Sequence, residues 1–436
     1  MPASTPAFGF PKVALVMARL IVDGEDRGCR FFIVPVCNER EMYKGVESIR
    51  LGHRSGTSPL DFSITRFNQV LVPHSALVSS KMGDYSMPKY PLQAWWDEVW
   101  RIPYGTMAVT APWISSIKAA AYIAGKYSMH RCIIGKENCP FPIISFRTQQ
   151  WPIAHATAVA HVMSTWYPFA VQQTMDMSLD HCVRHGIAVV AKTTACRHFQ
   201  RCVPEVSERC GAQGTFEHNY MARIEVSFLR SNSTSCTEHA SYQNDGKGVI
   251  IAEGDVLTLC IRLFSELVQK KYRIPLPDPS ESLLAQHAHS ILEENMDLLS
   301  QMPDGHRSSA FNSLLLPQSE IAIEAIGHAL AYSAALHSGL PKQILDIYEC
   351  AVIRRDPAWY SENAGLTRLV QRMREDKAIT AVMPHLEGYL DDLSIEEYVS
   401  APIVSDKAWK EYVGAMPVYT GNAVPESSFD QVQAML

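Results

Sequence analysis

Helical periodicity dominates the chain between residues 104 and 210, and this pattern limits the possible folds most strongly. The stretch 107–127 is rich in small and apolar residues and has few charges, as expected for a buried helix. The helical segments that the pattern predicts are residues 107–127, residues 143–177 with interruptions at Pro152 and Pro168, residues 179–203, and residues 205–210. The chain is therefore predicted to be mainly α.

The first 80 residues have a different pattern, which is typical of β-strands. Residues 13–23 and 30–36 predict two strands joined by a turn at Gly24–Gly28. Two shorter strands are predicted around residues 46–51 and 62–72, and Pro73 ends the second of them. No partner strand precedes the first strand, so its edge must be covered by something else.

A second helical unit is predicted after the Pro-rich linker that follows Ile274. Its helices are predicted near residues 283–300, 319–338, 341–354 and 366–384. We therefore expect a partial β-domain at residues 1–80 followed by two helical-bundle domains, at 81–275 and 276–436. Residues 226–246 are polar and aperiodic, and we interpret them as a loop inserted into the first helical domain.

Composition excludes several classes of protein. The chain has 436 residues, of which 47% are apolar and 19% are charged, so it can bury a sizeable core. The net charge is -6 and no basic stripe is present, so nucleic acid is not an expected partner. The apolar runs are too short to span a membrane. The N-terminus lacks signal-peptide features, and the 11 cysteines match neither a disulfide framework nor a zinc pattern, which favours reduced thiols and no metal site.

Glu253 is the candidate catalytic residue. It lies between the apolar, β-branched run Val249–Ile251 and a helical pattern that begins at Val256, and Asp255 suits the N-cap of that helix. A carboxylate at such a position can be partly desolvated and act as a base. An exposed structural acid in a helix-entry turn is the alternative, and the local sequence leaves both open.

Five stretches, taken together, identify a resemblance. They are ITRFNQVLVP (64–73), IAGKYSMHR (123–131), FRTQQWPI (146–153), RCGAQG (209–214) and IAEGD (251–255). In order and in approximate spacing they resemble the acyl-CoA oxidase family, within the acyl-CoA dehydrogenase superfamily. The resemblance implies a fold in which FAD and an acyl-CoA thioester lie between a β-domain and a helical bundle. It also implies α,β-desaturation to a trans-2-enoyl-CoA, with electrons passing to O2 to give hydrogen peroxide.

The same resemblance assigns roles to individual residues. Glu253, in the IAEGD motif, matches the base that removes the proton next to the thioester carbonyl. Arg131 matches an arginine that contacts the flavin diphosphate, and the glycine turn of RCGAQG matches one that touches flavin across a dimer interface, so a homodimer is implied. The complete set of cofactor-binding residues implied in this way is Arg131, Gln149, Gln150, Gly211, Gln213, Gly214 and Gly254.

The sequence also departs from the family. The helical domain with which the family begins, and the first strands of its β-domain, have no counterpart here, so we interpret the chain as an N-terminally truncated member. Lys126 stands where the family usually has arginine, and lysine cannot form a bidentate fork. The alternatives are therefore a catalytically inactive homologue that acts in dimerisation or partner binding, and a flavin-free catalyst that uses Glu253. The family resemblance favours the peroxisome, with the cytoplasm as the alternative, because the final A-M-L departs from an S-K-L signal.

Overall fold

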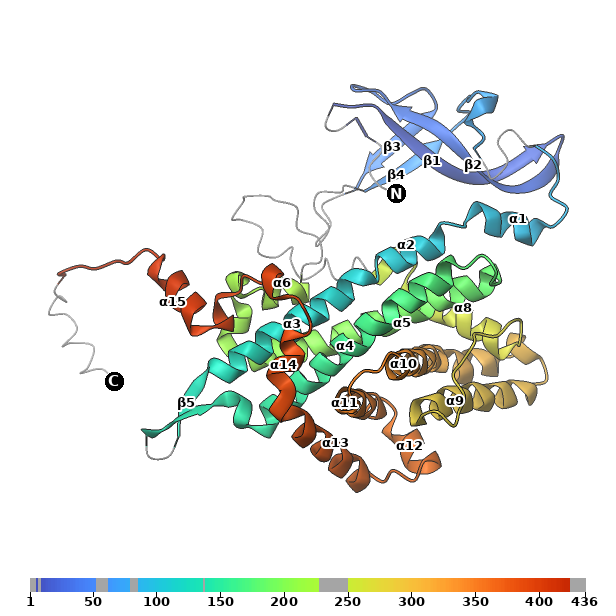
Figure 1. The fold of residues 1–436 in the computed structure, drawn as a ribbon. Coiled ribbons are helices and arrows are strands. Elements are labelled where there is room, and N and C mark those ends of the chain that lie inside the picture. The colour runs from blue at the N-terminus through green and yellow to red at the C-terminus, as the bar shows by residue number, and fades with distance from the viewer. Residues whose placement is uncertain are drawn as a thin grey trace, which may run out of the picture.

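The structure is a computed structural model that describes residues 5–6, 9–51, 62–78, 85–135, 138–226 and 250–423. Apart from Val226, the predicted insertion at residues 226–246 lies outside the described residues. Helices make up most of the described chain, and a small group of strands lies at the N-terminal end (Figure 1). The prediction of a mainly α fold with a partial β-domain is confirmed.

The N-terminal strands form two antiparallel pairs. β1 (Lys12–Val22) pairs with β2 (Glu25–Cys37), and β3 (Val46–Arg50) pairs with β4 (Ser63–Phe67). The turn between β1 and β2 is shorter than predicted, because Asp23 and Gly24 both have positive φ angles, of 53° and 81°. A two-residue turn of this kind follows the natural twist of a hairpin, so β2 begins at Glu25 rather than near residue 30.

Three long helices run side by side through the body of the molecule (Figure 1). They are α3 (Ala111–His130), α4 (Arg147–Met175) and α5 (His181–Arg209). Two short helices precede them, α1 (Pro91–Glu98) and α2 (Ile102–Ala108). This part also contains the short strands β5 (Cys132–Ile134) and β6 (Pro140–Pro142) and the short helix α6 (Met221–Val226).

The predicted breaks at prolines are wrong. Pro152 and Pro168 both lie inside the continuous helix α4, and Pro204 lies inside α5, which unites two segments predicted to be separate. Each proline removes one backbone hydrogen bond. Both helices are nevertheless buried along most of their length, and the packing of the neighbouring helices keeps them continuous.

The C-terminal half supplies the other side of the bundle, and its four predicted helices are confirmed to within two residues at each end. Its helices are α8 (Val256–Val268), α9 (Leu283–Ser300), α10 (Ser319–His337), α11 (Lys342–Ile353), α12 (Pro357–Asn363), α13 (Arg368–Val382), α14 (Leu386–Asp391) and α15 (Asp406–Gly414). Buried side chains from both predicted helical units form one continuous hydrophobic cluster. The domain boundary at residue 275 stays a prediction.

Helices α5 and α10 are joined both by close packing and by charge. Arg197 donates to both carboxylate oxygens of Glu320 at 2.5 and 2.7 Å, and Arg201 forms a second two-pronged pair with Glu324. Such forked pairs fix the direction of both partners. Next to them Gly327 touches Thr194 so closely that no larger residue fits.

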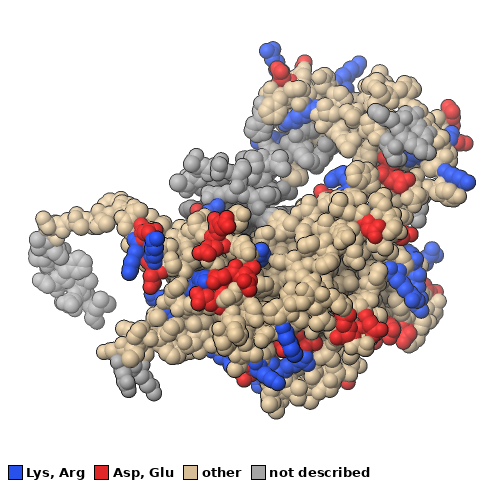
Figure 2. Space-filling model, in the orientation of Figure 1, with Lys and Arg blue, Asp and Glu red and all other residues tan. Residues whose placement is uncertain are grey.

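Positive and negative side chains are interspersed over the face of the molecule shown in Figure 2, which also has broad uncharged areas. None of the helices in the described ranges combines the length and the apolar character needed to cross a membrane.

Substitution of Gly327 tests the contact between α5 and α10. A Cβ atom at this position would lie 1.8 Å from Thr194 Oγ1. We therefore expect Gly327→Ala to lower the free energy of unfolding by about 2 kcal/mol, as measured by chemical denaturation. The control is Gly388→Ala in α14, where no atom lies within 4 Å of the added carbon and no loss is expected. Equal stability of the two variants would contradict the packing described here.

Candidate functional site

Glu253 lies in a tight turn at the start of α8. Its φ angle is 54° and that of Gly254 is 95°, so two successive residues have left-handed backbone. Asp255 ends the turn and accepts a hydrogen bond from the Thr258 amide at 3.1 Å, as predicted for the N-cap. The left-handed conformation is costly for a residue with a side chain, so neighbouring groups must hold Glu253 in place.

The Glu253 carboxylate packs against Gly105 in α2. A Cβ atom at Gly105 would lie 2.6 Å from both the carboxyl carbon and Oε2, so the glycine provides the space that the carboxylate occupies. Arg101, one turn earlier in the chain, places Nη1 3.8 Å from Glu253 Oε1. The Glu253 side chain retains 25% of its exposure, which makes it a half-buried carboxylate with a cation at its rim. A carboxylate in such a place is partly shielded from bulk water and can act as a base.

Lys192 of α5 approaches the same turn from inside the protein. Its Nζ atom donates to the carbonyl oxygens of Ala252 at 2.5 Å and Gly254 at 2.6 Å. These two carbonyls flank Glu253 on either side. The turn is thus bound to α5 through its backbone and to α2 through its side chain.

A second group of predicted residues lines a cavity of ≈ 370 Å³ at the other end of the bundle. Arg131, at the end of α3, faces Gly211 and Gln213 of the short 3₁₀-helix Gly211–Thr215 across this cavity. Its guanidinium forms no ion pair or hydrogen bond with any described residue. Ser405, Asp406 and Trp409 from the start of α15 close the other side. The structure therefore brings together the predicted diphosphate arginine and the predicted glycine turn.

The glycine turn has a defined internal structure. Gly211 has a φ of 57°, and a Cβ at Gly214 would lie 2.6 Å from the Ser207 carbonyl oxygen. The Gln213 side chain accepts a hydrogen bond from Asn219 Nδ2 at 2.8 Å. Both glycines are required by the backbone, since a side chain at Gly214 would strike α5 and one at Gly211 would be strained.

The remaining predicted residues have roles inside the chain. Gln149 Nε2 donates to Ser128 Oγ and to the Arg209 carbonyl, both at 2.9 Å, and so it joins α4 to the ends of α3 and α5. The Gln150 side chain, which is half-buried beside it, makes no hydrogen bond to the described residues. Lys126 forms ion pairs with Asp391 and Glu387 of α14 at 2.7 and 3.3 Å, so carboxylates of the same chain balance its charge.

Within one chain the two groups lie far apart. Lys192, which binds the Glu253 turn, and Arg209, which lies just before the glycine turn, both belong to α5. The stretch of helix between them is about 25 Å long at about 1.5 Å per residue. The two groups therefore lie at different places along α5 within a single copy of the chain.

Sequence reasoning missed two residues of the Glu253 site, and a signal was present for each. Gly105 is a glycine inside a helical pattern, which often marks close approach of another group. Lys192 is a lone lysine within the apolar run GIAVVAKTTA of a buried helix, where a charge must find a partner. The sequence does not reveal that both residues converge on the turn at Glu253, because they come from separate helices.

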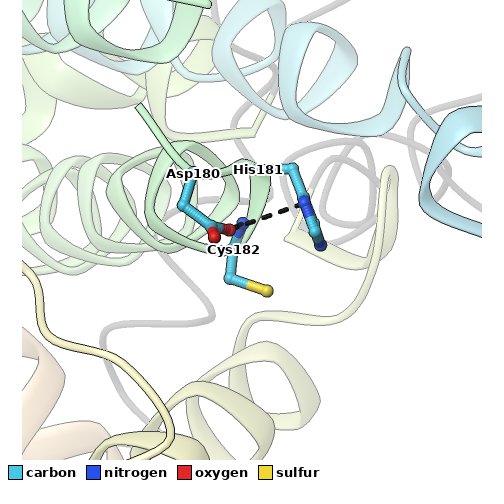
Figure 3. Close-up of side chains that lie close together, drawn as sticks. All are labelled: Asp180, His181 and Cys182. Carbon is cyan, nitrogen blue, oxygen red and sulfur yellow. Dashed lines mark hydrogen bonds and ion pairs between the residues drawn. The ribbon is translucent and has the colours of Figure 1, made fainter. Parts of the chain in front are cut away.

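The described residues include one group of three side chains whose geometry could hold a metal ion, formed by Asp180, His181 and Cys182 at the start of α5 (Figure 3). Asp180 is the N-cap and accepts from the Cys182 amide at 2.8 Å. The His181 ring packs on Trp96 with centroids 4.8 Å apart. Burial raises the pKa of the Cys182 thiol to about 11, so it is protonated at neutral pH. Helix capping and packing account for this group.

Comparison with known proteins supports the resemblance seen in the sequence. No family model matches the chain. The chain is similar to a mouse protein named acyl-coenzyme A oxidase-like protein, with 29% identity over 132 residues. That match covers 29% of this chain and 21% of the mouse protein.

Solved structures match over nearly the whole chain. Acyl-CoA oxidase 3 from Yarrowia lipolytica superposes with a TM-score of 0.74 and 15% identity, covering 99% of this chain and 70% of the other. Acyl-CoA oxidase-2 from Caenorhabditis elegans, bound to FAD, ascaroside-CoA and ATP, gives a TM-score of 0.70 and 15% identity, with coverage of 97% and 69%. The fold is that of the acyl-CoA oxidases, and the predicted resemblance to this family is confirmed.

Substitution of Gly105 tests the contact that locates Glu253. We expect Gly105→Ala to displace the carboxylate, because the added methyl group would occupy its position. A crystal structure of the variant measures the displacement, and Gly388→Ala is the control that leaves Glu253 unmoved. A Glu253 carboxylate still packed on residue 105 after the substitution would show that α2 does not define its position.

Proposed function

We propose that this chain is an FAD-dependent oxidoreductase of the acyl-CoA oxidase type, which converts an acyl-CoA thioester to the trans-2-enoyl-CoA. The observation that carries the proposal is the half-buried Glu253 carboxylate, held in a left-handed turn against Gly105. The fold supports it, as do the FAD and ascaroside-CoA bound in the Caenorhabditis elegans structure. Because the match covers only 21% of the mouse relative, the activity is proposed for this chain rather than inherited from that protein.

Glu253 acts as the base in this proposal. A proton next to a thioester carbonyl is weakly acidic, so the base must be close, oriented and partly shielded from water. The turn provides the orientation, because its backbone is fixed on both sides of Glu253 and its side chain rests on Gly105. Arg101, with its Nη1 atom 3.8 Å from Glu253 Oε1, places a cation at the exposed side of the carboxylate.

FAD, when bound, supplies the acceptor for the hydride from the β-carbon and the route of electrons to O2, with hydrogen peroxide as the product. The residues present fit its phosphate-bearing end. Arg131 has no partner among the described groups and faces the glycine turn across a cavity of ≈ 370 Å³. A planar guanidinium is suited to a diphosphate, and a glycine turn lets the backbone approach one closely. Asp406 also lines the cavity, and its carboxylate would repel a phosphate. Arg131 is therefore the main group in the lining that would attract one.

We also propose a homodimer, and the separation of the two groups supports it. The Glu253 turn and the Arg131 cavity lie at opposite ends of a stretch of α5 that is about 25 Å long. We propose that each complete site combines Glu253 of one protomer with the Arg131 cavity of its partner. A twofold arrangement builds two such sites at once.

Substitution of Glu253 tests the proposed base. Glu253→Gln is expected to retain flavin and to lower turnover of an acyl-CoA by about 10²–10⁴-fold, since it removes proton transfer without changing shape. Visible absorbance measures bound flavin, and peroxide release measures turnover. The matched control is Asp255→Asn, which removes a neighbouring charge and keeps a good N-cap residue. Normal turnover in the Glu253 variant would exclude this residue as the base. A colourless wild-type protein without turnover would favour the inactive homologue.

Substitution of Arg131 tests the cofactor cavity. We expect Arg131→Gln to lower flavin occupancy of the purified protein by about tenfold, because a charge-assisted pair to a phosphate is lost. The ratio of flavin to protein absorbance measures occupancy. Arg147→Gln is the control, since Arg147 is also exposed near this end of the bundle but bonds to Thr380 and Asp376. Unchanged occupancy in the Arg131 variant would contradict the proposed location of the diphosphate.

A further inference from the structure

Lys192 is the one residue of the Glu253 site that is fully buried and charged. Its side chain has no exposed surface. Neighbouring residues of the same helix, such as Val189 and Ala195, are apolar and buried as well. An ammonium group in such a place is expensive unless it is hydrogen-bonded. Its ammonium donates hydrogen bonds to the backbone carbonyls of Ala252 and Gly254, at 2.5 and 2.6 Å.

Charges around Lys192 are few and lie mainly on the side of the turn. Burial lowers its pKa to about 8, against the opposing influence of Cys196 on its own helix, Asp255 and Glu253 in the turn, and Cys260 on α8. An amine with such a pKa still carries its proton at pH 7. The ammonium thus remains a donor to both carbonyls under ordinary conditions.

The turn itself depends on these two bonds. Two successive residues have positive φ, and one of them, Glu253, has a side chain and therefore carries backbone strain. The carbonyls on either side of Glu253 would lose a buried donor if Lys192 were absent. Lys192 makes no hydrogen bond or ion pair with the Glu253 carboxylate, so it acts on Glu253 through the backbone.

We infer that Lys192 is a positioning residue. Its ammonium binds the two carbonyls that flank Glu253 and thereby orients the carboxylate, which packs against Gly105, toward the substrate. The catalytic part of this inference rests on the proposed function. The structural part does not rest on it, because the hydrogen bonds of Lys192 to the turn are present whether or not the chain turns over an acyl-CoA. A misplacement of about 1 Å in a reacting group can cost about 10²-fold in rate.

Lys192→Met tests both parts in the full-length protein. It keeps the length of the side chain and removes the charge and both donors. We expect faster hydrogen exchange of the amides of residues 253–258, and a kcat that is lower by about 10–100-fold with KM changed less than twofold. The matched control is Thr193→Val, which removes the neighbouring buried contact of α5 with Cys260 Sγ at 3.2 Å but leaves the turn bound. It is expected to change neither measurement by more than about twofold.

Lys192→Ala with added propylammonium is the second test. The added cation replaces the lost side chain, so it is expected to restore slow exchange of the turn and most of the lost kcat, whereas neutral propanol, with one donor for two carbonyls, restores clearly less of both. Native exchange and native kcat in Lys192→Met would overturn the inference, as would equal effects of Lys192→Met and Thr193→Val. If the wild-type protein shows no turnover, the proposed function fails, and the exchange measurements still decide whether Lys192 holds the turn.

Discussion

The buried surface of α5 forces its charged side chains to find partners, and the rest of the structure is arranged around those partners. Arg197 and Arg201 meet this constraint with two glutamates of α10, while Lys192 meets it with backbone carbonyls of the turn before α8. Unpaired, any of these groups would cost several kcal/mol. One helix therefore fixes the positions of two others through charge, in addition to the apolar contacts that they share.

This arrangement explains why the candidate base and the candidate cofactor cavity are both rigidly placed yet separate. The Glu253 turn is fixed by the middle of α5 and the glycine turn by its end. A helix is stiff over such a length, so neither part can move to the other within one chain. In the proposed dimer, a joint site would combine these two parts from different copies, and the same stiffness would align both sites.

The fold matches those of acyl-CoA oxidases at about 15% identity, which shows how little of the sequence the architecture requires. What the architecture needs is a set of apolar helices of suitable length and a few positions with special demands. Gly327 against Thr194 and Gly214 against the Ser207 carbonyl are two such positions, where a single added carbon would separate packed elements.

Sequence periodicity alone determined the mainly helical character of the chain, the β-strands near its N-terminus, and the positions of the later helices to within two residues. The N-cap at Asp255 also followed from local chemistry. These features depend on residues close in sequence, whose backbone preferences act without help from the rest of the chain.

Tertiary structure decided the rest. Helices α4 and α5 continue through Pro152, Pro168 and Pro204, because burial against neighbouring helices outweighs the hydrogen bond that each proline removes. It also decided that Gly105 and Lys192 converge on Glu253 from different helices. Such contacts join residues far apart along the chain, and only the packing of whole helices brings them within reach.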